Sequence, residues 1–299
     1  MINLSKFDII QITIQPLGGI IMKSKKNYIP ETIIFITVLS ILISLILIYL
    51  IDLNNIAGLR DYMFSLNPGY FFFEFRPFVF HNWYRNGGLA EIMQWLLLGG
   101  SAFFAALMAG KDNNTTRKEK MFWGIMGIVF ILMLIEDAGD PRHTIRSYVQ
   151  AFFSEVVQGP MGSLTELIYF SILAVIPLYA LIRYGKTLKQ VPRSLYYTFS
   201  GFVFYAVATI LSFLGSAIDL YHRAGGVLYD FMIKLGDDAL AQIWQNYNLR
   251  ERWDFIEFFL MDSLVEEVLE LLGAAAFLAA VLAFLLDKYY LSEKSELNN

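Results

Sequence analysis

The sequence "LMLIEDAGDPRH", from Leu132 to His143, combines an apolar run with a group of acids. It ends an apolar run that begins at Met121 and is long enough for a membrane helix, and it places three acids within five residues. The C-terminal end of a helix carries a partial negative charge, so acidic side chains are disfavoured there. The stretch therefore predicts a membrane helix ending in acids that some positive group must neutralise.

The composition of the whole chain agrees with a membrane protein. Hydrophobic residues make up 57% of it and charged residues 17%, with 26 Phe and 17 Tyr, which a soluble domain of this length could not bury. The net charge of -4 gives no sign of nucleic-acid binding. Because the chain has no cysteine, disulfides, thiolate nucleophiles and thiolate-ligated metals are excluded.

Six apolar stretches are long enough to cross about 30 Å of hydrocarbon at roughly 1.5 Å per residue. They are Thr32–Ile51, Leu89–Ala109, Met121–Asp140, Leu164–Ile182, Tyr197–Asp219 and Ser263–Leu286. We therefore predict an all-α, polytopic integral membrane protein with one six-helix domain over residues 32–287. Residues 1–31 would be a cytoplasmic or interfacial segment, and residues 288–299 a cytoplasmic tail.

Basic residues predict the orientation of this bundle in the cell membrane. They gather before the first stretch, in the second-to-third and fourth-to-fifth connections, and after the last stretch; examples are Lys26, Lys118, Lys189 and Lys288. The positive-inside rule then places both termini in the cytoplasm. The long connections 52–88 and 223–262 would lie outside, packed in the headgroup layer or covering a substrate as a lid.

With this orientation, acids of five helices fall near the outer end of the hydrocarbon layer, whereas the cytoplasmic halves are nearly free of them. These acids are Glu91, Glu136, Asp137, Asp140, Glu166, Asp219, Glu267 and Glu270. His81, His143 and His222 fall on the same side. Charged groups at such depth are costly, so this asymmetry is the main functional signal.

Some of these acids are explained by helix capping. "SLTE" from Ser163 and "SLVE" from Ser263 have the spacing of a capping box, and "GLAE" from Gly88 has it with glycine at the cap. Capping does not explain Glu136, Asp137, Asp140 and Asp219, which lie at helix C-termini, nor Glu267 and Glu270. Asp262, Glu266 and Glu270 are four residues apart and would form one stripe on a helix.

Two interpretations of the surplus acids stay open. Arg142 and Arg146 can fold back over Glu136 and Asp140, which would make a purely structural ion network. The acids nevertheless outnumber the nearby arginines, so a divalent metal or a transported cation could supply the missing charge.

The metal interpretation predicts a metal-dependent membrane enzyme, a hydrolase or transferase acting on a lipid or lipid-linked substrate. The expected ligands are Glu136, Asp140, His143, Asp219, His222 and Glu270, a set that suits Zn, Mg, Mn or Ca. Glu267 would act as general acid or base, and Arg142 and Arg146 would hold an anionic headgroup. The alternatives are a cation or proton transporter or channel, and a non-catalytic subunit that binds a protein partner or a second copy.

Three motifs, taken in order, resemble a family of uncharacterised polytopic prokaryotic membrane proteins with acid-rich helix ends. They are "GGLAEIMQW" (Gly87–Trp95), "LIEDAGDPRHTIR" (Leu134–Arg146) and "VEEVLELLGAAAFL" (Val265–Leu278). The middle motif departs from the family, in which a Glu-Glu pair is followed by Ile-Ser-Trp-Gly-Gln. The resemblance implies the topology and the order of the acids, and it implies no activity.

Overall fold

The structure is a computed structural model that describes residues 27–65, 78–84, 87–110, 115–153, 155–218, 220–250 and 256–297. Within these ranges the side chains of residues 64, 81, 155–160, 163, 216–218, 246–250 and 289–297 are not described. All regular structure in the described ranges is helical. Most of the expected N-terminal segment, residues 1–26, lies outside the described residues.

Six helices in the described part are long and apolar enough to cross a membrane, which confirms the predicted all-α architecture. They are α1 (Ile29–Leu47), α4 (Leu89–Gly110), α5 (Arg117–Gly139), α7 (Glu155–Tyr184), α8 (Pro192–Ile218) and α12 (Glu267–Leu297). The π-helix η1 (Ile48–Leu53) continues α1. Short α11 (Ile256–Phe259) and the π-helix η5 (Leu260–Glu266) lead without a break into α12.

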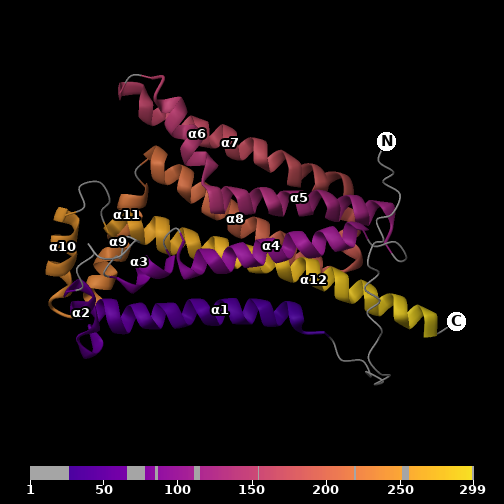
Figure 1. Cartoon of the computed structure of the whole chain (residues 1–299), viewed down its shortest axis with the longest axis horizontal. Coiled ribbons are helices and arrows are strands. Elements are labelled where there is room, and N and C mark those ends of the chain that lie inside the picture. The colour runs from indigo at the N-terminus through magenta and orange to yellow at the C-terminus, as the bar shows by residue number, and fades with distance from the viewer. Residues whose placement is uncertain are drawn as a thin grey trace, which may run out of the picture.

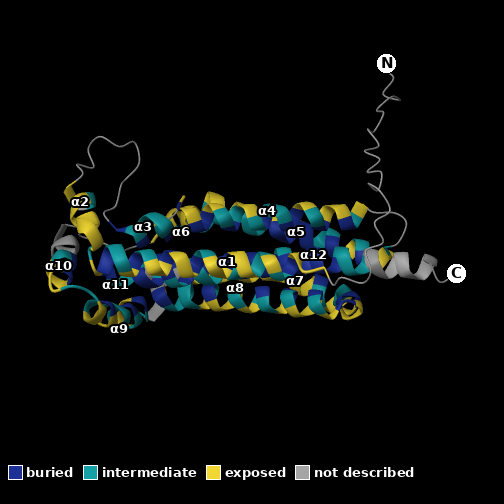
Figure 2. Cartoon of the chain, turned by 90° about the horizontal axis from the view of Figure 1, so that it is seen from below, coloured by how far each residue is buried: buried dark blue, intermediate teal, exposed yellow. Residues whose placement is uncertain are grey.

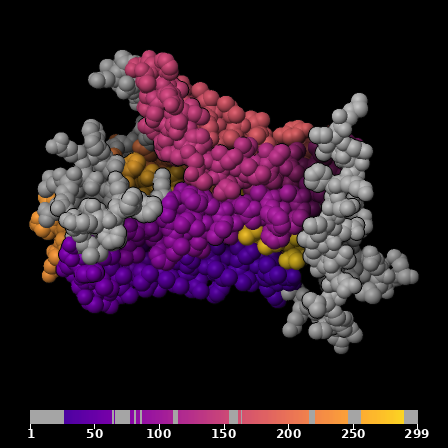
Figure 3. Space-filling model, in the orientation of Figure 1, coloured from indigo at the N-terminus to yellow at the C-terminus, as the bar shows by residue number. Residues whose placement is uncertain are grey.

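Helix α12 runs through the middle of the bundle and packs against α8, α4 and α1, while α5 packs against α4 and α7 (Figure 1). In its most apolar window 67% of the α12 residues are buried, compared with 17% in α7 and in α8. Little of α12 is visible in the space-filling view, since α1, α4 and α5 lie in front of it (Figure 3). The outer helices instead expose large apolar side chains such as Phe35, Ile182 and Phe199, as expected of surfaces that face lipid (Figure 2).

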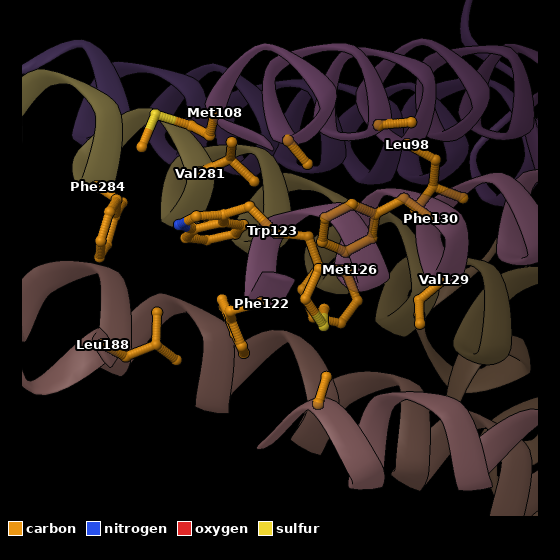
Figure 4. Close-up of a cluster of buried hydrophobic side chains, with 14 of the residues drawn as sticks. Leu98, Met108, Phe122, Trp123, Met126, Val129, Phe130, Leu188, Val281 and Phe284 are labelled. Atoms are coloured by element: carbon orange, nitrogen blue, oxygen red, sulfur yellow. The ribbon is translucent and has the colours of Figure 1, made fainter. Parts of the chain in front are cut away.

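The largest buried core lies between α4, α5 and α12 (Figure 4). Trp123 packs edge-on against Phe284 with ring centroids 5.2 Å apart, and Phe130 lies 5.1 Å from Phe277. Small residues let α8 and α12 approach closely at the same level, because a Cβ at Gly201 would lie 2.6 Å from the Phe277 ring. The core therefore fixes the rotation of α12 relative to its neighbours.

The two ends of the bundle differ. We call the end that carries Ile29 and Lys288 the terminal end, and the opposite end the loop end (Figure 1). The terminal end also holds η4 (Gly185–Gln190). The loop end holds η2 (Ile56–Gly58), α2 (Leu59–Ser65), α3 (Val79–Tyr84), α6 (Pro141–Gln150), α9 (Leu220–Leu235), α10 (Leu240–Arg250) and α11.

Ion pairs connect the helices at the terminal end. Arg193 of α8 binds Asp287 of α12 and, at 2.8 Å, Glu31 of α1. Lys288 donates to the buried Glu119 of α5 at 2.8 Å. Glu119 also forms a capping box with Thr116 at the start of α5.

A buried arginine organises part of the loop end. Arg60 of α2 is fully buried and donates to both carboxylate oxygens of Asp237, at 2.8 and 3.1 Å, and to the backbone oxygens of Asp52 and Leu53. The Asp52 carboxylate accepts hydrogen bonds from the first backbone N–H groups of α3, those of Val79 and Phe80. Segments from three parts of the chain are thereby held together.

Two of the predicted capping boxes are wrong. Ser163 lies inside α7, which starts at Glu155, and Ser263 lies inside η5 of a helix that is continuous from Ile256. The third apolar stretch, expected to end at Asp140, ends there in the structure, because Asp140 adopts a left-handed conformation (φ 44°, ψ 46°) and α6 begins at Pro141. The third predicted box, "GLAE" from Gly88, lies at the start of α4, where Glu91 accepts a hydrogen bond from the Gly87 N–H group.

Candidate functional site

Six carboxylates from three helices gather on the loop-end side of the bundle, and we call them the acid cluster. They are Glu91 of α4, Glu136 and Asp137 of α5, Glu266 of η5, and Glu267 and Glu270 of α12, and they interact electrostatically with one another. Asp137 follows Glu119 by eighteen residues of one helix, which is about 27 Å along its axis. A hydrocarbon layer about 30 Å thick that began at Glu119 would therefore end near the cluster.

Gln94 of α4 lies at the centre of the acid cluster. Its side chain is fully buried, and its amide nitrogen lies 2.9 Å from Asp137 Oδ1 and 3.0 Å from Glu270 Oε2. The same nitrogen is 3.3 Å from the Tyr205 hydroxyl of α8. One neutral amide group therefore joins two acids from different helices and holds them near each other.

Tyrosine hydroxyls surround the acids. Tyr169 of α7 donates to Glu136, and Tyr221 of α9 donates to Glu266. Burial and the neighbouring Glu266 raise the pKa of the Tyr221 hydroxyl, which stays protonated and keeps its role as donor. The acid cluster is thus a hydrogen-bonded network and not a set of isolated carboxylates.

Arg142, in the first turn of α6, supplies positive charge. Its Nε lies 3.7 Å from Glu136 Oε1, its Nη1 donates to Ser212 at 3.3 Å, and its guanidinium lies 5.1 Å from the Phe170 ring centroid. Burial alone would lower the pKa of this guanidinium, but nearby carboxylates hold that pKa above its usual value. These carboxylates are Glu266, Glu136, Glu166 and Glu270.

Backbone features place these side chains. The left-handed Asp140 turns the chain between α5 and α6, which brings Arg142 back beside Glu136. Gly273 of α12 leaves room for the Tyr205 ring, because a Cβ there would lie 2.5 Å from it. Gly225 of α9 lies against the backbone of α11, which brings Tyr221 to η5.

Two buried oxygens around Gln94 have no hydrogen-bond partner in the described part of the chain. They are Gln94 Oε1 and Glu267 Oε2, both with almost no exposed surface. The Trp95 indole lies near Asp137 and contributes to the electrostatic environment of that carboxylate. Buried oxygens of this kind normally bind a proton donor, a water molecule or a cation.

The structure brings together four of the residues to which the sequence analysis gave a role as metal ligand, acid or base, or headgroup-binding group. Glu136, Glu267, Glu270 and Arg142 all belong to, or contact, the acid cluster. Arg146 instead pairs with Glu166 at 2.7 Å. Glu166 was expected to cap a helix, and this ion pair is its observed role.

Two other predicted ligands, Asp140 and His143, lie at the edge of the cluster, where they act electrostatically on Glu136. His143 pairs with Asp140, both largely exposed, and His222 is exposed on α9 with its ring 5.9 Å from that of Phe258. Asp219 lies outside the described residues. Among the residues that the structure describes, no group of three or more Asp, Glu or His side chains is arranged to hold a metal ion, so the metal set stays a prediction.

Sequence reasoning named no role for the tyrosines or for Gln94. The available signal for Gln94 was its position in "LAEIMQW", three residues after Glu91 and so on the same helix face. The tyrosines come from three further helices or helical segments, and no local spacing relates them to the acids. Comparison with known proteins adds nothing here, since no family model, curated protein or solved structure matches this chain.

Proposed function

We propose that this protein is a cation-handling membrane protein, in which the acid cluster takes up a proton or a metal cation during transport across the membrane. The observation that carries the proposal is the Gln94 amide, which binds Asp137 and Glu270 together inside a membrane bundle. Buried intramembrane acids that share a hydrogen-bond network are the usual groups for proton and cation relays. Six carboxylates against the nearby Arg142 leave a net negative charge that a cation would neutralise.

In the proposed arrangement the protein lies in the cell membrane. Both of its termini are in the cytoplasm. The support for this arrangement is the positive-inside rule, since Lys and Arg residues gather at the terminal end. The acid cluster then lies near the outer surface, and a cation would reach it from outside. The ion pairs of Arg193 and Lys288 would close the opposite end in this conformation.

Charge displacement on a solid-supported membrane tests this proposal without a known substrate. Purified protein in liposomes is adsorbed on the electrode, and jumps in proton, Na⁺ and K⁺ concentration are applied. We expect a transient current for at least one cation, strongly reduced in Asp137→Asn and Glu270→Gln. Asp230→Asn is the matched control, because Asp230 is an exposed acid at the same end of the bundle.

The proposal fails if the wild-type protein gives no current above that of empty liposomes for any cation. It also fails if Asp230→Asn reduces the current as much as the two cluster variants do. Size-exclusion profiles and helical circular dichroism show whether each variant is folded.

A second candidate is a metal-dependent enzyme that acts on a lipid or lipid-linked substrate. The observation that favours it is Arg142, whose Nε is 3.7 Å from Glu136 and makes no hydrogen bond, so the guanidinium has capacity for an anionic headgroup. Elemental analysis of the purified protein tests it. A stoichiometric divalent metal that is lost in Glu136→Gln and Glu270→Gln supports the enzyme, and metal-free protein contradicts it.

A further inference from the structure

The unpartnered side-chain oxygen of Gln94 indicates which kind of cation the acid cluster could bind. Gln94 is fully buried, and the nitrogen of its amide already donates to Asp137 and Glu270. The oxygen of the same amide has no hydrogen-bond partner in the described structure. A buried carbonyl left in this way costs free energy unless a ligand or water satisfies it.

A proton does not bind this oxygen itself, although a neighbouring carboxyl that has taken up a proton can donate a hydrogen bond to it. Carboxylates take up protons readily, whereas an amide oxygen is protonated only in strong acid. An amide oxygen is, however, a regular ligand of hard metal cations, together with carboxylates and water. A second buried oxygen, Glu267 Oε2, is also unpartnered, and Glu267 interacts electrostatically with Asp137, which binds Gln94.

The small number of ligands and the nearby guanidinium favour a monovalent cation. In the part of the chain that the structure describes, no three acids or histidines form the carboxylate-rich cage that Ca²⁺ sites commonly have. Arg142 adds positive charge beside Glu270 and Glu266. A cation with one charge needs fewer carboxylate ligands and is repelled less by the guanidinium.

We propose that the Gln94 carbonyl oxygen, with the carboxylates of Asp137 and Glu267, forms a binding site for a monovalent metal cation of the sodium type. The site rests on the proposed function and specifies its cation, since a metal cation and not a proton would be the ion handled. Water molecules complete the coordination. The amide nitrogen of Gln94 at the same time holds Glu270 beside the site.

The test measures the thermal stability of the protein in lipid nanodiscs. NaCl is titrated against choline chloride at constant ionic strength, and KCl and LiCl are run in parallel. A ligand that binds the folded state raises the Tm in proportion to the logarithm of its concentration above the dissociation constant. We expect such a rise for the preferred alkali cation and none for choline.

Three variants locate the site. Gln94→Met keeps the length of the side chain and removes the carbonyl, so the cation-dependent rise in Tm should disappear. Glu267→Gln should raise the half-saturating cation concentration about tenfold or more, and it serves if Gln94→Met does not fold. Asp230→Asn should respond as the wild-type protein does.

The outcomes separate this inference from the proposed function. A wild-type Tm that is the same in NaCl, KCl, LiCl and choline chloride overturns the site, because water or a protonated carboxyl would then satisfy the Gln94 oxygen. If proton jumps still displace charge in that case, the proposed function stands without it. A cation response that is unchanged in folded Gln94→Met or Glu267→Gln also overturns the site.

Discussion

Replacing Gly225 by alanine tests how α9 packs against α11. A Cβ at Gly225 would lie 1.8 Å from the backbone oxygen of Glu257 and 2.6 Å from its carbonyl carbon. The contacted atoms belong to the backbone, so no side-chain rotation relieves the clash and the two helices must separate. Overpacking costs about 1–3 kcal/mol and occasionally more. The 1.8 Å approach to a backbone atom places this change at the upper end of that range, about 3 kcal/mol. After subtracting the roughly 0.5–1 kcal/mol by which alanine favours a helix, we expect a net loss of about 2–2.5 kcal/mol.

The adjacent Gly226 provides the matched control. It lies on the same helix, and a Cβ there would meet nothing within 4 Å. Gly226→Ala should therefore stabilise the protein by about 0.5–1 kcal/mol. Unfolding free energies are measured by SDS titration of protein in mixed micelles, followed by circular dichroism. If Gly225→Ala and Gly226→Ala agree within about 0.5 kcal/mol, the close contact between α9 and α11 is refuted.

Three further substitutions probe polar contacts in other parts of the protein. Arg60→Met should lower the free energy of unfolding by about 2–3 kcal/mol. This is at the low end for a broken buried ion pair, because Asp237 keeps some solvent contact. Faster hydrogen exchange in the loop-end helices should show where the stability is lost. Thr116→Ala should cost about 1 kcal/mol through the lost cap of α5, as measured by SDS titration. Arg142→Met should cost about 2–4 kcal/mol by leaving acids unneutralised. Adding Glu266→Gln should recover about 1 kcal/mol of that loss in a double-mutant cycle.

Each of these predictions has a result that contradicts it. Arg223 is an exposed arginine on α9, and Arg223→Met should change stability by less than about 0.5 kcal/mol. If Arg223→Met costs as much stability as Arg60→Met, the burial of Arg60 is not the cause of the loss. An unchanged Thr116→Ala would mean that the capping box does not form in solution. If Glu266→Gln makes Arg142→Met less stable still, Arg142 does not neutralise the acid cluster.

The sequence predicts the membrane helices well because each needs a long apolar run, and such runs are local. Their loop ends are less predictable. Helix α7 begins nine residues before the expected Leu164, and the last helix is continuous from Ile256. Polar residues can extend a helix beyond the hydrocarbon layer, so a Ser with a Glu three residues later at that boundary does not mark a helix start.

The acid cluster is predictable in part. Depth along each helix can be counted from its charged end, and this places Glu136, Glu267 and Glu270 at one level. Which side chains meet there depends on helix rotation and on close packing, as at Gly273, where the missing Cβ lets Tyr205 lie near Gln94. A single sequence carries no information on such pairings.

The role of Arg60 was not predictable for the same reason. In the sequence it is one arginine of an outer connection, and its ion-pair partner Asp237 lies far along the chain in another. Arg146 shows the converse error, since it was expected near Glu136 and binds Glu166 instead. Long side chains reach several candidate partners, and tertiary structure selects among them.

The π-helix η5 makes the effect of a one-residue deletion depend on where in the last helix it falls. Hydrogen bonds of a π-helix skip one residue more than those of an α-helix, so the segment from Leu260 to Glu266 holds a surplus within each turn. Removing one residue there would let a regular α-helix form with the flanking residues facing nearly the same way, whereas removing Val268 from α12 would turn everything on one side of the deletion by about 100° relative to the other. Tyr221 could then no longer meet Glu266 while Gln94 meets Glu270. In this protein a length change of one residue in this part of α12 would be as disruptive to the site as the loss of a ligand.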